Sequence, residues 1–449
     1  MIDNRFLLKK LVRIAVPIAI QGSVAATLNL VDNLMVGSLG EAELAAVGIG
    51  SQIYFIHYLF LFGFNSGTST FLAQFYGKGD FANIRKSTGF AMTVAMGISL
   101  IFFVGTLLFP EQILNIYTEE PHVKYLAMPY LRICTVCFLM VAVSAPFEIA
   151  FKAIQRPTVP LMSGVVMFST NTILNYILIF GKLGFPAMGI SGAAIATVCA
   201  RALGLCLMLF FAFRAQSPLR GSLRAFFGWS PELMHRIVKN AIPTTLNELL
   251  WSIGTSMYVA AFSRMGTTSY AAYQASESVR QIFSFAAFSV GDAALILVGE
   301  KLGEGDHEYA YELAKKLLKV GIVVGLVFGG ALMLAAWPLV HLFALSPLGQ
   351  TYAFRTVLVI GGTLFIVLFS GICTTGVLRG GGDTAFAART EILCIWLIAV
   401  PIAFAASLWW HLPIYLAVLC MRLTEVTESI IYIFRIRSRK WMNTVIRDL

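Results

Sequence analysis

The sequence predicts an all-α integral membrane protein with twelve transmembrane helices in two pseudo-symmetric six-helix lobes. Three observations lead to this prediction. Of the 449 residues, 58% are apolar and only 12% are charged, and the mean hydropathy of +0.79 exceeds what one water-soluble core can bury. Long stretches contain no Asp, Glu, Lys or Arg. The first half of the sequence also matches the second half at a constant offset.

Uncharged stretches of membrane-spanning length occur along the whole chain. A helix needs roughly 20 residues to cross a hydrocarbon layer of about 30 Å. Stretches without an acidic or basic residue cover 44–77, 87–110, 157–181, 320–354, 356–378 and 392–421. With shorter apolar segments, they predict spans at 14–36, 46–72, 87–109, 126–150, 158–180 and 190–213, and then at 238–262, 271–299, 316–338, 354–377, 390–409 and 412–434. The first apolar segment lacks a signal-peptide cleavage pattern, so we expect it to remain as the first helix.

The basic residues indicate how the helices are oriented. With an even number of spans, both ends of the chain lie on one side of the membrane. Most of the 33 Lys and Arg residues fall on that side, and the opposite side receives only Lys124, Arg132, Lys182, Arg264 and Arg355. We therefore expect a multi-pass protein of the cell (inner) membrane with both termini in the cytoplasm. This topology and anionic lipid explain the net charge of +10 without a nucleic-acid partner.

An internal repeat predicts the two lobes. Pro17 matches Pro243 at an offset of 226 residues, and the same offset aligns the Gly-Lys-Gly-Asp motif at 77–80 with the Gly-Glu-Gly-Asp motif at 303–306. Because each repeat has an even number of spans, both repeats enter the membrane from the same side, and a cavity should lie between them. We expect an amino-terminal lobe, a cytoplasmic linker and a carboxy-terminal lobe at residues 1–213, 214–237 and 238–449.

Glycines in the second half have structural interpretations. Gly321, Gly325 and Gly329 follow one another at four-residue spacing, which predicts a ridge for close packing of two helices. The run 380–382, followed by Asp383, lacks the preceding strand and the following Gly-Lys-Ser/Thr of a phosphate-binding loop. We interpret this run as a turn.

Carboxylates inside the expected spans include Asp32, Glu148, Glu248, Glu277 and Asp292. An ionised group costs about 3 kcal/mol at the centre of a membrane helix, so such groups usually serve transport. Asp32 and Glu248 have apolar neighbours, and desolvation there favours the neutral, protonated form. Either carboxylate could therefore carry a proton, or bind Na⁺ among amide and carbonyl oxygens. The alternative is a carboxylate that only pairs with a buried arginine.

The remaining charges have local explanations. Asp292 approaches the expected cytoplasmic end of its helix and can be hydrated there. Glu277 and Arg280 are three residues apart and can pair on one helix face. Two further acidic residues lie within two helical turns of Arg422, and we expect both to pair with it: Glu425 and Glu428.

Two asparagines supply polar groups in the first half. Asn171 and Asn175 are four residues apart and share one face of the helix expected at 158–180. We expect them to face the amino-terminal cavity with Asp32, as oxygen ligands or hydrogen-bond partners, and hydrogen bonding between helices is an equally open alternative. The aromatic content of 13% suits a cavity that binds flat cations.

Several motifs resemble those of a known transporter family. They are Pro17 and Gln21, VDNLMVGSLGEAELAAVGIG at 31–50, QFYGKGD at 74–80, FGKLGFPAMGISGAAIAT at 180–197 and VLRGGGDT at 377–384. Together they resemble the multidrug and toxic compound extrusion family over nearly the whole chain. The resemblance implies a V-shaped pair of six-helix lobes that alternates between inward-open and outward-open states. It also implies export of cationic or amphiphilic compounds against a H⁺ or Na⁺ gradient.

The resemblance further implies a cation site. Asp32 matches the family's aspartate of the first helix, Asn171 its asparagine of the fifth and Glu248 its glutamate of the seventh. Position 175 is Asn where many members have Asp, which removes a negative charge. Residues 368–370 replace an aspartate that some members carry before the arginine of their Leu-Arg-Gly motif. These departures favour H⁺ over Na⁺ by a small margin.

The candidate coupling and substrate residues are Asp32, Glu248, Asn171 and Asn175, with Thr197, Glu277 and Asp292 as further candidates and a possible Na⁺ site at Asp32, Asn171 and Asn175. An ionised carboxylate would bind either the substrate cation or the coupling ion, so that loading one releases the other. The expected partners are small organic cations or drugs and the lipid bilayer. We expect a monomer without a cofactor.

Two other functions are open to a protein of this kind. A lipid-linked precursor flippase of related two-lobe architecture is the main alternative, but it should line its cavity with Arg or Lys for a pyrophosphate. An intramembrane enzyme would need a nucleophile with a base, or clustered metal ligands, and the six His residues lack metal-like spacing. The sequence therefore predicts a secondary active transporter rather than an enzyme.

Overall fold

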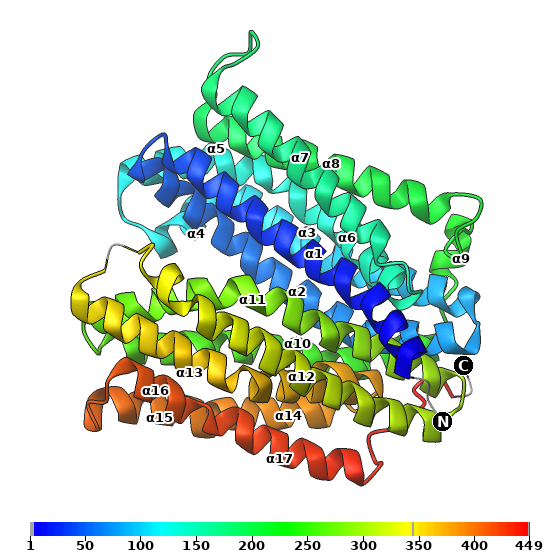
Figure 1. The fold of residues 1–449 in the computed structure, drawn as a ribbon. Helices are drawn as coiled ribbons and strands as arrows, with labels where there is room; N and C mark the ends of the chain where they lie inside the picture. The colour runs from blue at the N-terminus through cyan, green and yellow to red at the C-terminus, as the bar shows by residue number, and fades with distance from the viewer. Residues whose placement is uncertain (1–3, 344, 448) are drawn as a thin grey trace. The chain divides into compact units, whose positions relative to one another are not determined.

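The computed structural model describes residues 4–343, 345–447 and 449, with the backbone alone for 282–287. Within these residues the regular elements are helices, and no strand occurs (Figure 1). Nine of the described helices are long and apolar enough to cross a membrane, judged by length and composition. The predicted class, an all-helical multi-pass membrane protein, is confirmed.

Each predicted span falls on one helix or on two consecutive ones. In the first half these are α1 (Asn4–Gly37), α2 (Glu41–Lys78), α3 (Phe81–Leu108), α5 (Pro121–Cys134) with α6 (Val136–Ala153), α7 (Thr158–Phe180) and α8 (Gly189–Phe213). In the second half they are α10 (Pro231–Ser263), α11 (Thr267–Gly303), α12 (His307–Val340), α13 (Pro347–Gly371), α14 (Thr384–Cys394) with α15 (Val400–Phe404), and α16 (Ile414–Met421) with α17 (Leu423–Arg437). Three π-helical stretches continue α13, α14 and α15: η1 (Ile372–Leu378), η2 (Ile395–Ala399) and η3 (Ala405–Trp409). Two short helices lie outside these spans: α4 (Pro110–Tyr117) and α9 (Leu223–Phe227).

The predicted linker at 214–237 is partly helical. It contains α9, and α10 also begins inside it. The start of α10 follows from local chemistry, because Ser230 Oγ accepts a hydrogen bond from the Leu233 N–H at 3.2 Å and Pro231 occupies the first helical position. The irregular connection is therefore shorter than the sequence suggested.

The described chain divides into two compact units by its internal contacts. Unit 1 comprises Met1–Ala19, Ala73–Gly79 and Val238–Leu449, and unit 2 comprises Ile20–Leu72 and Asp80–Ile237. The start of α1 and the end of α2 thus group with the second half of the chain, although each helix continues into unit 2. The predicted lobe boundaries and the cavity between the lobes stay predictions.

Each unit has an apolar core of its own. In unit 2, buried residues of α1, α2, α5, α7 and α8 pack together, among them Val36, Ala46, Leu131, Ile179 and Ile190. In unit 1, a large core joins the start of α1 to α11, α12, η1 and α17, among them Leu11, Val298, Leu317, Val377 and Tyr432. This shared core explains why the start of α1 belongs to unit 1.

The repeated Gly-x-Gly-Asp motif forms the same turn in both copies. Gly79 and Gly305 have φ angles of +73° and +84°, in the left-handed region that favours glycine. The following residue, Asp80 or Asp306, caps the next helix by accepting a hydrogen bond from the backbone N–H three residues on, at 2.9 and 3.0 Å. The two copies of the repeat therefore share a turn and a helix start.

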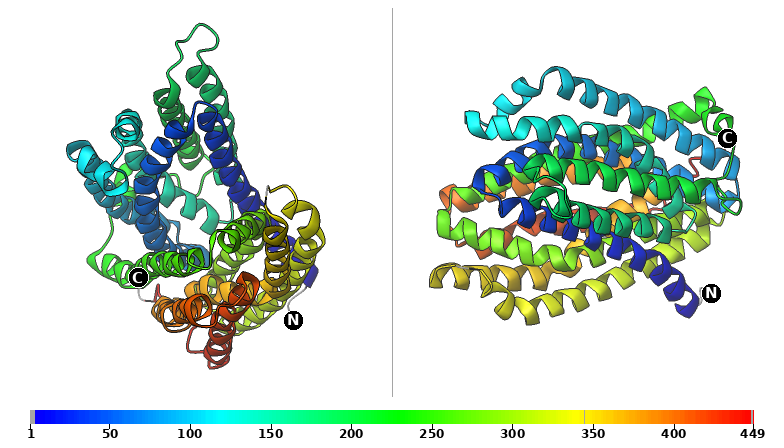
Figure 2. Two further views of the ribbon diagram at one scale, coloured as in Figure 1. Left: turned by 90° about the vertical axis from the view of Figure 1, so that its left-hand side faces the viewer. Right: turned by 90° about the horizontal axis from the view of Figure 1, so that it is seen from above.

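The predicted glycine ridge of α12 packs against α13, and the two helices run side by side (Figure 2). Gly321, Gly325 and Gly329 are all buried. A Cβ atom at Gly325 would lie 2.4 Å from the Phe365 Cα, and one at Gly329 would lie 2.2 Å from the Gly361 carbonyl oxygen. The backbones approach closely because these positions have no side chain.

Two neighbouring glycines of α12 provide a matched test of this packing. Gly329→Ala places a methyl group on a carbonyl oxygen, and overpacking of this kind costs about 1–3 kcal/mol. Gly330→Ala meets nothing within 4 Å and should stabilise the helix by about 0.5–1 kcal/mol. In detergent, we expect the melting temperature measured by tryptophan fluorescence to fall for the first variant and to hold or rise for the second. Equal melting temperatures would contradict the close packing.

Candidate functional site

The candidate residues of the first half meet in unit 2. Asp32 of α1, Asn171 and Asn175 of α7, and Thr197 of α8 form one connected set of hydrogen bonds. The asparagine side chains are buried, with 1% and 0% exposure, whereas Asp32 and Thr197 are partly exposed. The structure thus brings together the residues that the sequence placed at one site, and their role in coupling stays a prediction.

The hydrogen bonds of this cluster run in one direction. Thr197 Oγ1 donates to the Ala193 carbonyl at 3.0 Å, so it accepts from Asn171 Nδ2 at 3.2 Å. Asn171 therefore turns its Oδ1 towards Asn175, whose Nδ2 donates to it at 2.9 Å and also donates to Asp32 Oδ1. Asn175 Oδ1 is buried and has no hydrogen-bond partner within the described residues. The Thr197 hydroxyl thus fixes Asn175 as a donor to the Asp32 carboxylate.

A basic residue lies near this cluster without bonding to it. Arg201 follows Thr197 by one turn of α8 and lies within electrostatic reach of Asp32. Its guanidinium lies over the Tyr54 ring, 4.5 Å from the ring centroid. No salt bridge reaches Asp32 in the part of the chain that the structure describes. Asp32 is therefore a carboxylate that has a hydrogen-bond donor but no bonded counter-ion.

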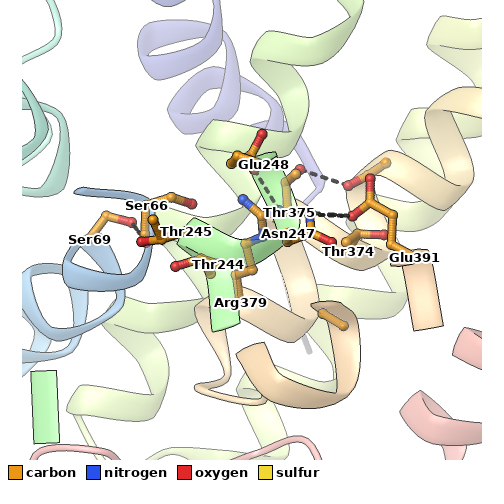
Figure 3. Close-up of polar contacts among 12 residues, drawn as sticks. Ser66, Ser69, Thr244, Thr245, Asn247, Glu248, Thr374, Thr375, Arg379 and Glu391 are labelled. Carbon is orange, nitrogen blue, oxygen red and sulfur yellow. Dashed lines mark hydrogen bonds and ion pairs between the residues drawn. The ribbon is translucent and has the colours of Figure 1, made fainter. Parts of the chain in front are cut away.

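Glu248 lies in a second polar cluster, inside unit 1 (Figure 3). Arg379 Nη2 is 3.0 Å from Glu248 Oε1 and 3.9 Å from Glu391 Oε2. Asn247 Nδ2 donates to Glu391 Oε2 at 2.9 Å. The Arg379 side chain is only 3% exposed, and that of Glu248 is 14% exposed. Glu248 therefore has the buried arginine partner that formed the alternative to a coupling role.

The two lower-ranked acidic candidates have simple surroundings. Glu277 and Arg280 form an ion pair of 2.7 Å on one face of α11, as their spacing indicates. Asp292, also on α11, is exposed. Neither arrangement calls for a functional role, so a role in coupling for either residue stays a prediction.

The predicted pairing of two glutamates with Arg422 is half right. Glu425 pairs with Arg422 at 2.6 Å. The prediction for Glu428 is wrong, because its Oε2 instead accepts a hydrogen bond of 2.6 Å from Ser370 Oγ of α13. Six residues turn a helix by about 240°, so Glu428 points away from Arg422. The Glu428 side chain is buried, with 6% exposure.

Arg379 and Glu391 are functional-site candidates that the predicted spans did not indicate. The span predicted to end at 377 places Arg379 outside the membrane, but the helical structure continues to 380 and buries the side chain. The span predicted to begin at 390 places Glu391 at a helix end, whereas α14 begins at Thr384 and Glu391 lies about two turns inside it. The glycine run and Asp383 marked this early start in the sequence.

Comparison with known families identifies the chain. A family model described as MatE matches residues 17–177 and 243–405. The chain belongs to the MatE family. The two matches begin at Pro17 and Pro243, the same pair that defines the internal repeat. The resemblance to the multidrug and toxic compound extrusion family is therefore confirmed.

This MatE chain resembles known proteins along almost its whole length. It is 24% identical over 436 residues to the probable multidrug resistance protein NorM of Thermotoga maritima, covering 96% of this chain and 93% of that one. It is 28% identical over 415 residues to the probable multidrug resistance protein NorM of Rhizobium meliloti, covering 87% and 86%. A solved structure of a multidrug resistance MATE family transporter of the MOP superfamily, in an outward-facing conformation, matches with a TM-score of 0.86 at 19% identity and covers 96% of both chains. At this identity the structural match shows the fold alone.

The two polar clusters of this MatE chain differ in what they can bind. Glu248 already has its charge compensated by Arg379. Asp32 has its charge stabilised by an amide N–H but not neutralised. The carboxylate charge in unit 2 is therefore less compensated than that of Glu248 in unit 1.

Removing Arg379 from the buried ion pair in unit 1 should lower the stability of the protein more than neutralising Glu248 does. Arg379→Met leaves Glu248 and Glu391 without a base, which should cost about 3–5 kcal/mol. Glu248→Gln keeps Arg379 beside Glu391 and offers the guanidinium an amide oxygen. We expect thermal unfolding in detergent to rank Arg379→Met as less stable than Glu248→Gln, with partial recovery in the double variant. Equal stability of the two single variants would refute the pairing.

Proposed function

We propose that this MatE protein is a secondary active multidrug efflux antiporter, which exports organic cations or amphiphilic compounds in exchange for H⁺. The observation that carries the proposal is the Asp32 cluster: an acidic group without a bonded base on a helix of a membrane protein. The names of the curated relatives, which describe multidrug resistance proteins, support the substrate class.

The geometry of the cluster supports a positive passenger. An ionised Asp32 attracts cations, and Asn175 stabilises that ionised form by donating a hydrogen bond to it. A cationic drug and a proton both need the same carboxylate. Protonation of Asp32 from one side of the membrane would therefore release the drug, and deprotonation on the other side would restore the site.

The direction of the hydrogen bonds supports H⁺ rather than Na⁺. Sodium would need oxygen ligands, yet Asn175 presents its N–H groups to Asp32 and to Asn171. If Asn175 turned its amide oxygen towards Asp32, its hydrogen bond to Asn171 could be restored only by rotating Asn171, and that rotation would break the bond from Asn171 to Thr197. A Na⁺ site at Asp32, Asn171 and Asn175 is therefore the less favoured form of the same proposal.

Glu248 is the second candidate for coupling. It can bind a cation only when its ion pair with Arg379 opens. We therefore rank Glu248 below Asp32 as a coupling residue.

The flippase alternative would need basic groups to hold a pyrophosphate. The cluster at Asp32 presents a carboxylate and amides instead, which favours a cationic passenger over an anionic one.

We further propose an inner-membrane location with both termini in the cytoplasm and action as a monomer. The unequal distribution of Lys and Arg supports the orientation. Both MatE repeats lie in one chain, which supports the monomer.

Asp32→Asn tests the assignment of the exchange site. The amide cannot carry a negative charge, so neither the drug nor the proton can bind as proposed. In cells exposed to ethidium, we expect efflux by this variant to fall to the level of cells without the protein. Glu41→Gln is the matched control, because it neutralises an exposed carboxylate at the start of α2, and it should retain efflux. Normal efflux by Asp32→Asn, at equal expression, would exclude the assignment.

Reconstitution into liposomes tests the coupling ion. With a pH gradient and a Na⁺ gradient imposed separately, we expect the pH gradient alone to drive ethidium transport. Transport driven only by Na⁺ would overturn the proposal for H⁺, and transport driven by neither would indicate facilitated diffusion.

Thr197 offers a matched pair for the same assay. Thr197→Ser keeps the hydroxyl that sets the direction of the hydrogen bonds and should behave like the unmodified protein. Thr197→Val removes it, so Asn171 and Asn175 can both rotate, the Asn175 oxygen can face Asp32, and some dependence on Na⁺ should appear.

A further inference from the structure

A segment that follows α17 packs on the glycine turn at 380–382, within unit 1. We call residues 438–447 the strap. Trp441 of the strap is fully buried, and a Cβ atom at Gly381 would lie 2.3 Å from its ring. The Asn443 N–H donates to the Gly381 carbonyl at 2.9 Å. The glycine run therefore forms the surface on which the strap is seated.

The strap also binds the end of α2. Gln74 is fully buried, and its Nε2 donates to the Asn443 carbonyl at 2.9 Å. Its Oε1 accepts from the Val445 N–H, also at 2.9 Å. One carboxamide thus satisfies a carbonyl and an N–H of the strap, which only a side chain with both a donor and an acceptor can do.

The end of α2 lies directly against the end of α11. A Cβ atom at Gly77 would lie 1.9 Å from the Glu300 carbonyl oxygen, and one at Gly303 would lie 1.9 Å from the Gln74 carbonyl oxygen. These positions are equivalent in the repeat, so the contact is reciprocal. Glu300 is secured by Lys10 of α1 at 2.6 Å, whereas its equivalent Gln74 is secured by the strap.

This contact lies where α2 passes from one unit of the chain to the other. Residues of α2 up to Leu72 belong to unit 2, whereas Ala73–Gly79 belong to unit 1. A rearrangement of α2 with unit 2 must therefore bend the helix near Leu72 or free its end from unit 1. The bonds that would have to open for the second route include those of Gln74 to the strap.

We propose that the strap is a releasable latch: it holds the end of α2 in unit 1, and its release lets that end move during the transport cycle. The strap is suited to this because it binds the Gln74 side chain of α2 through hydrogen bonds. The inference goes beyond the proposed antiport, since neither the coupling ion nor the substrate enters it.

Hydrogen–deuterium exchange of the full-length protein in detergent tests the latch. Trp441→Ala changes a residue of the strap, and Gln74→Leu changes a residue of α2. If the two segments open together, each variant should speed amide exchange about tenfold both at 73–79 and in the strap, as expected for the loss of one or two hydrogen bonds. Gln112→Leu, on the exposed face of α4, is the matched control and should change neither segment.

The reciprocal response decides the outcome. Faster exchange in the strap of Trp441→Ala, with 73–79 unchanged, would overturn the latch, and so would unchanged exchange in Gln74→Leu. If either variant fails to fold, Gln74→Glu serves in its place, because it keeps the acceptor for Val445 and loses the donor to Asn443. It should produce a smaller rise in both segments, and a rise in one segment alone would count against the proposal.

A transport assay separates a latch from a purely structural clasp. The Asp32 cluster is intact in Gln74→Leu, so the ethidium concentration for half-maximal efflux should not change, whereas the maximal rate should. An unchanged maximal rate, with both segments released, would exclude a role in the transport cycle. Because the exchange measurement needs no transport, failure of the antiport proposal and failure of the latch are distinguishable.

Discussion

A charged side chain inside an apolar protein must find its partners within that protein. This chain meets the requirement in two ways. Glu248 is neutralised by Arg379, a base on another helix of the same unit. Asp32 is stabilised by the amide of Asn175, which leaves its net charge in place. The first solution favours a fixed internal structure, and the second leaves a charge that a passenger can satisfy. The proposed exchange of one cation for another depends on this difference.

Much of the fold could be predicted because each membrane span can be recognised from a continuous uncharged stretch of the sequence. The cluster around Asp32 could be predicted for a similar reason, since Asn171 and Asn175 are one helical turn apart and must share a face. The partner of Glu248 could not be predicted from the sequence. Arg379 lies 131 residues further along the chain and just beyond a predicted helix end, so no local spacing connects the two. The predicted pairing of Glu428 with Arg422 is wrong for a related reason. Two residues that are close in the sequence can still point to different sides of a helix.

The two MatE repeats keep the same backbone device and differ in how they secure it. Both copies of the Gly-x-Gly-Asp motif make a left-handed turn and cap the next helix. Both first glycines, Gly77 and Gly303, lie against the carbonyl of the other copy's helix. The side chains three residues before them have diverged, since Glu300 binds a lysine and Gln74 binds backbone groups of the strap. Steric requirements are thus shared by the repeats, whereas polar partners are particular to each one.

The π-helical stretch η1 (Ile372–Leu378) ends immediately before Arg379. A π-turn closes its hydrogen bond over one residue more than an α-turn, so it offsets the angular register of everything that follows. A helical wheel drawn at about 100° per residue along α13 therefore assigns Arg379 to the wrong side of the helix. The guanidinium meets Glu248 through this widened turn, which makes the length of the segment before Arg379 as important to the ion pair as the arginine itself. Loss of a single residue from η1 would redirect the side chain while leaving the composition of the site intact.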